Sequence, residues 1–393
     1  MSLIRSERSA AAILLGAAAL GLILANTAAG PGLLALQHTV IGPAGSHLNL
    51  SIGHWISDGL LAIFFFIVAV ELKHELVAGE LNSVRKAMHP AIAATGGVVV
   101  PALLYLVFTA GSGYEHGWPV PTATDIAFAL GVLAVFGRGL PNRLRVFLLA
   151  LAVLDDLIAI VIIAIFFTQD PNLGMLALAA LTTVAFWLLG RLLRHPARVG
   201  RMRGPIVVLM VLLGVLTWVF VHASGVHATI AGVGLGLALS RAPGGRAAHA
   251  LEPWSNGFVL PLFAFSAALV TIPNVSPAHL APPFWAILVA LPVGKLIGIT
   301  LGGWLGSFIG RRNERHPIDV PNLLVIAALG GIGFTVSLLM NELAFRRSQE
   351  VVDEGTLAVL LGSGIAMVVS GVLVSLRARR YRRLHPLPPV SDR

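Results

Sequence analysis

Two adjacent carboxylates, Asp155 and Asp156, lie in the middle of an otherwise apolar stretch, residues 146–168. A carboxylate at the centre of a lipid bilayer costs about 2.5–3.5 kcal/mol even on insertion scales, and two neighbouring carboxylates also repel each other. A membrane segment that keeps this pair is expected to hold it in a watery cavity, neutralised by protons, metal cations or a basic partner. Carboxylate and hydroxyl oxygens suit alkali and alkaline-earth cations. The pair therefore indicates cation transport.

Lys295 is a second ionisable residue inside an apolar stretch. A buried amine either pairs with a carboxylate or loses its proton. Asp155 and Asp156 project about 100° apart if they lie on a helix, so we expect one to face the cation and the other to face Lys295. A carboxylate that binds either a proton or a cation is sufficient for exchange, and the competition between the two makes transport depend on pH.

Two apolar segments carry residues that interrupt helices. Asp125 follows Pro119 and Pro121, and the later segment 329–337 has three glycines in four residues. Proline and glycine both work against an unbroken helix. Half-helix ends that meet inside a membrane carry partial charges, positive at N-termini and negative at C-termini. We expect Asp125 and Lys295 to compensate these charges.

The composition is that of a membrane protein. Hydrophobic residues make up 56% of the 393 residues, charged residues only 11%, and the mean hydropathy is +0.87. Soluble domains carry about 25% charged residues. The absence of cysteine excludes disulfides and thiolate sites. We interpret residues 1–393 as a single integral membrane transporter domain that is not an enzyme and holds no resident cofactor.

The predicted fold class is an all-α polytopic membrane protein. About twelve segments approach the ~20 residues needed to cross a bilayer: 10–29, 58–79, 88–110, 119–137, 143–168, 173–192, 205–221, 225–240, 255–271, 283–309, 321–342 and 356–376. The interrupted segments are spans 4 and 11. They are the middle members of two three-span groups, approximately 88–168 and 283–376, which enter the membrane in opposite directions. This arrangement predicts inverted repeats with two broken crossing helices.

Basic residues are distributed very unevenly between the two sides. With twelve spans, all but three of the 27 Lys and Arg residues fall on one side, the exceptions being Arg346, Arg347 and Lys295. The positive-inside rule places that side, and both termini, in the cytoplasm. The asymmetry explains the basic composition without a nucleic-acid partner. The Arg-rich tail is expected to contact anionic lipid.

Two local features leave alternatives open. Arg5 and Arg8 precede an apolar run that is also typical of a signal peptide, but its removal would leave eleven spans and spoil the charge pattern. The longest external connection, residues 30–57, contains a weakly alternating stretch, His47–Ile52. This stretch predicts either a small external β-hairpin or a plain loop.

Several motifs, in the same order along nearly the whole chain, resemble those of the NhaA-type sodium/proton antiporters. They are Val70-Glu-Leu-Lys-His-Glu75, Thr122–Gly131, Leu154-Asp-Asp-Leu157, Ser224-Gly-Val-His-Ala-Thr229, Leu260-Pro-Leu-Phe-Ala-Phe265, Gly294-Lys295 and Gly330-Gly-Ile-Gly-Phe-Thr335. The resemblance implies electrogenic, pH-regulated exchange of Na⁺ or Li⁺ for H⁺ in a bacterial inner membrane.

The resemblance also implies roles for individual residues. Asp156 would be the main cation ligand and proton carrier, with Thr124 and Asp155 completing the Na⁺ or Li⁺ site. Asp155 would partner Lys295 and take part in proton exchange. Asp125 and Lys295 would balance the helix ends.

A pH-responsive cluster at a cytoplasmic funnel is implied in the same way. Its members would be Glu71, His74, Glu75, His249 and Glu252, while His227 would be linked to pH response and to the subunit boundary. The long first external loop would form a hairpin that joins two protomers into a homodimer.

Three positions depart from the family pattern. His74 stands where an Arg is familiar, Glu252 where a His is, and Ala248 where an acidic residue is. The core site matches the pattern, so we expect the departures to alter the pH profile.

Three other functions could use a polytopic membrane fold of this kind. A sodium-coupled symporter of an organic solute would share the same architecture, but it should not need two titrating carboxylates. An intramembrane aspartyl protease needs two carboxylates that converge on one water, and adjacent residues on one helix are poorly placed for this. A channel is the weakest of these interpretations. Transport of Na⁺ against H⁺ without an organic substrate or proteolysis would separate exchange from symport and from the protease.

Overall fold

A computed structural model of the chain describes residues 7–43, 48–79, 81–168, 171–194, 202–272, 279–310 and 318–384. Several residues of the predicted charge pattern lie outside these ranges: Arg5, Arg198, Arg201, Arg311, Arg312, Arg315 and Arg393. The chain divides into two compact units. Unit 1 comprises mainly residues 12–82 and 156–273, and unit 2 mainly residues 83–155 and 274–393. The boundary falls inside one helix, α7 (Asn142–Phe166), between Asp155 and Asp156.

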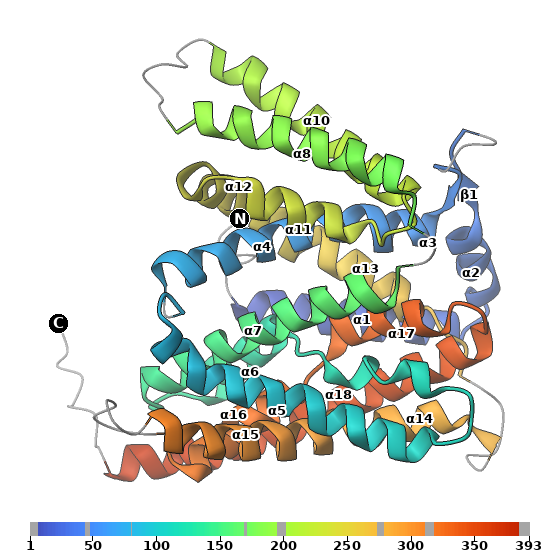
Figure 1. Cartoon of the computed structure of the whole chain (residues 1–393). Coiled ribbons are helices and arrows are strands. Elements are labelled where there is room, and N and C mark those ends of the chain that lie inside the picture. Colours follow the sequence, from blue (N-terminus) through green and yellow to red (C-terminus); the bar gives the residue numbers. More distant parts are fainter. Residues whose placement is uncertain are drawn as a thin grey trace, which may run out of the picture. The chain divides into compact units, whose positions relative to one another are not determined.

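Unit 1 is built from helices that carry long apolar runs. Its elements are most of α1 (Glu7–Ala25), α2 (Gly30–His38), β1 (Val40–Ile41), β2 (Leu50–Ser51), α3 (Ile52–His54), α4 (Leu61–Ala78), the end of α7, α8 (Leu173–Leu192), α10 (Arg203–Ala223), α11 (Thr229–Ala238), α12 (Arg241–Trp254) and α13 (Leu260–Ala267). A π-helical turn joins α3 to α4, and another joins α12 to α13. The helices α8 and α10 lie side by side (Figure 1).

The region predicted as a hairpin or loop contains both a helix and a small sheet. The strands β1 and β2 pair antiparallel, with Val40 opposite Ser51 and Ile41 opposite Leu50. The helix α2 precedes them and starts at Gly30, with Pro31 in its first turn. Proline is favoured at that position because its missing N–H has no helical partner there.

Unit 2 contains the interrupted segments. Its elements are the first residues of α1, then α5 (Val84–Thr109), α6 (Ile126–Phe136), the start of α7, α14 (Pro282–Val289), α15 (Lys295–Gly310), α16 (Val320–Gly330), α17 (Phe334–Phe345) and α18 (Gln349–Leu384). A 3₁₀ turn at Val120–Thr122 precedes α6, and a π-helical turn at Ala290–Gly294 joins α14 to α15.

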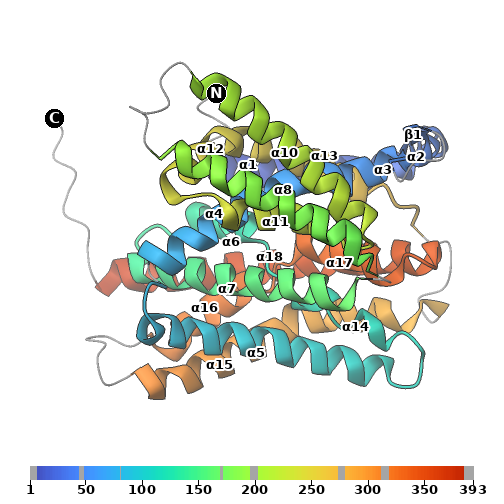
Figure 2. The ribbon, with the colours of Figure 1, turned by 45° about the horizontal axis from the view of Figure 1, so that its top comes forward.

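Glycines let two helices of unit 2 approach closely. A Cβ atom added to Gly298 on α15 would lie only 2.1 Å from the Gly96 carbonyl oxygen on α5, and one added to Gly96 would lie 2.2 Å from the Gly298 carbonyl oxygen. Helices without a hydrophobic driving force between them associate through such small residues. Figure 2 shows α15 running beside part of the longer helix α5.

The structure contains the long apolar helices that the sequence predicts for a polytopic membrane protein. Eight helices of the described residues are long and apolar enough to cross a bilayer, or up to ten if each of two bent helix pairs is one span. The helix α11, within predicted span 8, has only 10 residues, and α13, within predicted span 9, has 8. At 1.5 Å per residue neither could alone cross a hydrocarbon core of about 30 Å. The chain is thus an all-α polytopic membrane protein, and the total of twelve spans stays a prediction.

Candidate functional site

Lys295 and Asp155 form a buried ion pair in unit 2. The Lys295 Nζ atom donates to both carboxylate oxygens of Asp155, at 2.8 Å and 3.0 Å. Lys295 is 0% exposed and Asp155 is 2% exposed. The first residue of α15 thereby meets the middle of α7, 140 residues away. Asp155 and Asp156 were both candidates for the partner of Lys295, and the structure shows Asp155 in this contact.

Thr124 connects this ion pair to the end of another helix. Its Oγ1 accepts a hydrogen bond from Lys295 Nζ at 3.0 Å and donates one to the Gly330 carbonyl oxygen at 2.8 Å. Gly330 is the last residue of α16, where carbonyl groups lack helical partners. Lys295 therefore reaches the C-terminal end of α16 through one hydroxyl group.

The chain is not helical around Thr124, which explains how this side chain and its neighbour reach their partners. The 3₁₀ turn that starts after Pro119 ends at Thr122, and Asp125 has extended backbone angles. The Asp125 N–H donates to the Ile332 carbonyl oxygen at 2.6 Å, in the turn between α16 and α17. A Cβ at Gly333 would lie 3.1 Å from the Ala123 carbonyl oxygen, so glycine permits this close approach.

Asp125 lies at the N-terminal ends of two helices. Its Oδ1 accepts the Phe128 N–H of its own helix, α6, at 3.2 Å. Its Oδ2 accepts the N–H of Thr335 at 3.1 Å and the hydroxyl of Thr335 at 2.6 Å. Thr335 belongs to the first turn of α17. A negative group is stabilised at these positions, because helix N-termini carry partial positive charge.

Asp156 follows Asp155 on α7 and is 6% exposed. The two side chains leave the helix about 100° apart. Asp156 belongs to unit 1, whereas Thr124, Asp125, Asp155 and Lys295 belong to unit 2. The structure thus joins Thr124, Asp155 and Lys295 by hydrogen bonds, and Asp125 follows Thr124 in the chain and bonds the turn after α16. We call these four residues the Lys295 cluster, and Asp156 is covalently adjacent to it.

The residues assigned to pH response lie in unit 1 on two helices that pack together, α4 and α12. Glu71, His74 and Glu75 are on α4, and His249 and Glu252 are on α12. His249 Nδ1 lies 3.8 Å from a Glu252 carboxylate oxygen, and both side chains are largely exposed. Glu71 and His74 are exposed as well.

His227 is located away from that set, near Asp58. The His227 Nδ1 atom lies 3.9 Å from one Asp58 oxygen, and the His222 Nδ1 atom lies 4.0 Å from the other. Trp218 donates its indole N–H to the Asp58 carbonyl at 2.9 Å and stacks on His222. The sequence analysis gave no role to Asp58. The sequence could have indicated a role for Asp58, because it is an ionisable residue within a predicted span.

Thr335 and the Gly330 carbonyl are further members of the Lys295 cluster that sequence reasoning did not assign. Thr335 follows the glycine-rich stretch directly, and a hydroxyl beside unwound backbone is a common means of satisfying freed polar groups. The carbonyl of Gly330 could not be identified from residue types, since every residue carries one.

Comparisons with known proteins give a consistent result over the whole chain. A sequence model of the family described as Na+/H+ antiporter 1 matches residues 1–374. The chain is 63% identical over 383 residues to a protein of Clavibacter michiganensis subsp. michiganensis (strain NCPPB 382) named Na(+)/H(+) antiporter NhaA 2, covering 97% of this chain and 93% of that protein. It is 45% identical to the Na(+)/H(+) antiporter NhaA of Tropheryma whipplei (strain Twist), covering 100% and 99% of the two chains. It is 41% identical to the protein of the same name from Thermobifida fusca (strain YX), covering 97% and 95%.

Proposed function

This chain belongs to the Na+/H+ antiporter 1 family, and from that premise we propose that it exchanges Na⁺ or Li⁺ for H⁺ across a membrane. One observation carries the proposal: two adjacent carboxylates lie buried in an apolar helix, and one of them is held by a buried lysine. Lys295 pairs with Asp155, and we assign the neighbouring buried carboxylate, Asp156, as the group whose charge a proton or a cation neutralises.

In the proposed mechanism protons and cations compete for the same carboxylate. Asp156 binds Na⁺ or Li⁺ when it is ionised and carries a proton when it is not, while Asp155 and Thr124 supply further oxygens. These oxygens suit a hard monovalent cation. Because Lys295 bonds both Asp155 and Thr124, a cation that recruits these oxygens must weaken the lysine contacts. Asp155 thereby takes part in the proton exchange that accompanies cation binding.

The proposed architecture is an inverted repeat with two broken crossing helices. Three features support it. The helix α16 ends at Gly330 and α17 begins at Phe334, with a 51° bend between them. The segment before α6 is likewise non-helical at residues 123–125. Asp125 lies at the starts of α6 and α17, and Lys295 lies one hydroxyl group from the end of α16, as charge compensation of half-helix ends requires.

Regulation by pH is proposed to reside in unit 1. Glu71, His74, Glu75, His249 and Glu252 gather on the packed helices α4 and α12, and protonation changes the charge that an approaching cation meets. His227, which lies 3.9 Å from an Asp58 oxygen, is proposed to take part in this regulation.

The cellular setting is proposed from the charge pattern and from the family. The chain would lie in a bacterial inner membrane as a multi-pass protein of about twelve spans, with both termini in the cytoplasm. Its exchange would be electrogenic. The strands β1 and β2 would join two protomers in a homodimer.

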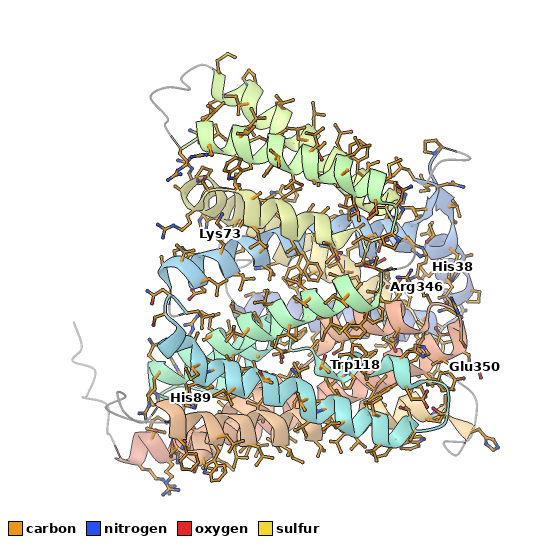
Figure 3. The ribbon with its side chains drawn as sticks, in the orientation of Figure 1. His38, Lys73, His89, Trp118, Arg346 and Glu350 are labelled. Carbon is orange, nitrogen blue, oxygen red and sulfur yellow. The ribbon has the colours of Figure 1, made fainter. Side chains whose placement is uncertain are left out.

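The test is sodium-driven proton movement in everted membrane vesicles between pH 6 and pH 9. We expect Na⁺ or Li⁺ to release protons from wild-type vesicles and not from vesicles that contain Asp156→Asn. Glu350→Gln is a matched control, because this exposed acid, labelled in Figure 3, lies in the first turn of α18, a helix that carries no residue of the Lys295 cluster. An electrogenic exchanger should also respond to an imposed membrane potential. Normal proton movement in Asp156→Asn would refute the assignment. Folded wild-type protein without any signal would favour a sodium-coupled symporter on the same scaffold.

A further inference from the structure

A hollow with a volume of about 240 Å³ lies between the end of α6 and the start of α7, in unit 2. Two arginines line it, Arg138 and Arg145, together with Asn142 and a set of mostly apolar residues that includes Leu133, Leu140 and Leu144. None of the described residues that line it is acidic. Both arginines have exposed side chains, so the hollow opens beside two guanidinium groups.

A third arginine comes from another helix to the turn beside the hollow. The turn between α6 and α7 contains Gly139, whose φ is +93°, a conformation that favours glycine. The side chain of Arg382, from the last turns of α18, passes over this glycine, with its Cγ only 2.8 Å from where a Cβ would lie. The neighbouring residues Arg379, Arg380 and Arg383 are exposed.

An exposed apolar surface leads away from these arginines. Val135 and Phe136, at the end of α6, are each 47% exposed, and Val372 and Leu376 on α18 are 52% and 56% exposed. The two helices pack together, with the Phe136 ring 3.6 Å from the Cβ position of Gly371. Positive charge and apolar surface are therefore adjacent at the level where the spans 115–136 and 142–166 meet.

We propose that this hollow binds the headgroup of an anionic phospholipid, whose acyl chains lie along the apolar surface of α6 and α18. Arginine recognises phosphate with paired, charge-assisted hydrogen bonds, and basic pockets between transmembrane helices hold acidic lipid headgroups. Three arginines would repel a cation, so the hollow is unsuited to the transported ion. The proposal does not depend on the exchange activity, because the hollow contains no residue of the Lys295 cluster.

The opposite end of unit 2 offers a matched comparison. Arg346 and Arg347 are also adjacent exposed arginines, and they precede the start of α18. Residues 349 and 379 are roughly 45 Å apart along that helix. Figure 3 shows Arg346 and Glu350 at the end of unit 2 opposite His89. Neither arginine lines the hollow between α6 and α7, so this pair serves as a charge-matched control.

The experiment measures lipid binding to the purified full-length protein in detergent. Short-chain phosphatidylglycerol is titrated against wild type, Arg138→Gln/Arg145→Gln and Arg346→Gln/Arg347→Gln, with phosphatidylcholine as the neutral lipid. We expect phosphatidylglycerol affinity to fall about fivefold for each arginine removed from the hollow. The control pair should bind as wild type does. Arg382→Gln tests the same site by a single change on another helix.

Three results would overturn the proposal. Equal losses in both double variants would show that affinity follows net charge and not the hollow. Binding of inorganic phosphate as tight as that of phosphatidylglycerol, with loss in the same variants, would identify a site for free phosphate. If Arg138→Gln/Arg145→Gln fails to fold, an unchanged affinity in Arg382→Gln also counts against the lipid assignment.

Discussion

Thr335 donates two hydrogen bonds to a single oxygen of Asp125, a residue 210 positions away in the sequence. The backbone N–H lies 3.1 Å and the hydroxyl 2.6 Å from Asp125 Oδ2. Since Asp125 also caps α6, one carboxylate joins the starts of two helices. The contact fixes α6 and α17 to each other beside Thr124 and Gly330, so its loss should disturb the geometry of the Lys295 cluster.

Replacing Thr335 by valine should therefore destabilise the protein. The change keeps the side-chain shape and removes only the hydroxyl, and hydrogen bonds to charged groups contribute about 1.5–3 kcal/mol. Thermal unfolding in detergent would measure the loss. Thr300→Val is the control, because the Thr300 hydroxyl is buried and has no hydrogen-bond partner among the described residues. Equal stability of the two variants would show that the Thr335 hydroxyl contributes nothing.

The ion pair between Lys295 and Asp155 should be strongly coupled. Lys295→Met leaves a buried carboxylate without its cation, and breaking a buried pair in this way costs about 3–5 kcal/mol. The double variant Lys295→Met/Asp155→Leu removes both charges and should recover much of that stability. A double-mutant cycle on unfolding free energies measures the coupling. Additive effects of the two single changes would contradict direct pairing.

This ion pair also shows how much of the site could be predicted from the sequence. The sequence indicated that Lys295 needs a carboxylate, because an isolated charge in an apolar span is unfavourable. Residue types alone did not choose between Asp155 and Asp156, since the distance of each to Lys295 depends on tertiary structure; the resemblance to the NhaA-type antiporters assigned Asp155. Residue types thus identified the ionisable groups, and tertiary packing determines which of them bond.

The backbone groups that bond to the site residues could not be predicted from the sequence either. The carbonyl of Gly330 bonds Thr124, and the carbonyl of Ile332 bonds the Asp125 N–H, but no residue type marks these groups. The helix α2 is different. Gly30 and Pro31 are typical of a helix start. The weak alternation of His47–Ile52 nevertheless led to the prediction of a hairpin or a plain loop for the whole connection.

The close contact between α5 and α15 gives a test of packing. Gly298→Ala would place a methyl group 2.1 Å from the Gly96 carbonyl oxygen, and forcing extra atoms into a packed interface costs about 1–3 kcal/mol or more. Gly364→Ala is the matched change on α18, where no atom lies within 4 Å of the added Cβ. Alanine there should stabilise the helix by about 0.5–1 kcal/mol. Melting temperatures should therefore move in opposite directions, and a similar shift in both variants would rule out tight packing at Gly298.

His74 offers a test of the proposed pH response. It is exposed on α4 between Glu71 and Glu75, and α4 packs against α12, which carries His249 and Glu252. A histidine loses its positive charge as the pH rises, whereas an arginine keeps it. His74→Arg should therefore keep this cluster more positive at alkaline pH, oppose the entry of cations, and shift the rise of exchange activity to higher pH.

A charge about 8 Å away in water changes an interaction by about 0.5 kcal/mol, which corresponds to about 0.4 pH units. Sodium-induced proton movement in everted vesicles, recorded at closely spaced values from pH 6 to pH 9, can resolve a shift of this size. His38→Arg is the control, because this exposed histidine ends α2, outside the helices α4 and α12. The proposal requires His74→Arg to shift the profile and His38→Arg to leave it in place. Coincident profiles for wild type and His74→Arg would remove His74 from the set of pH-responsive residues and leave the acidic members of α4 and α12 to account for regulation.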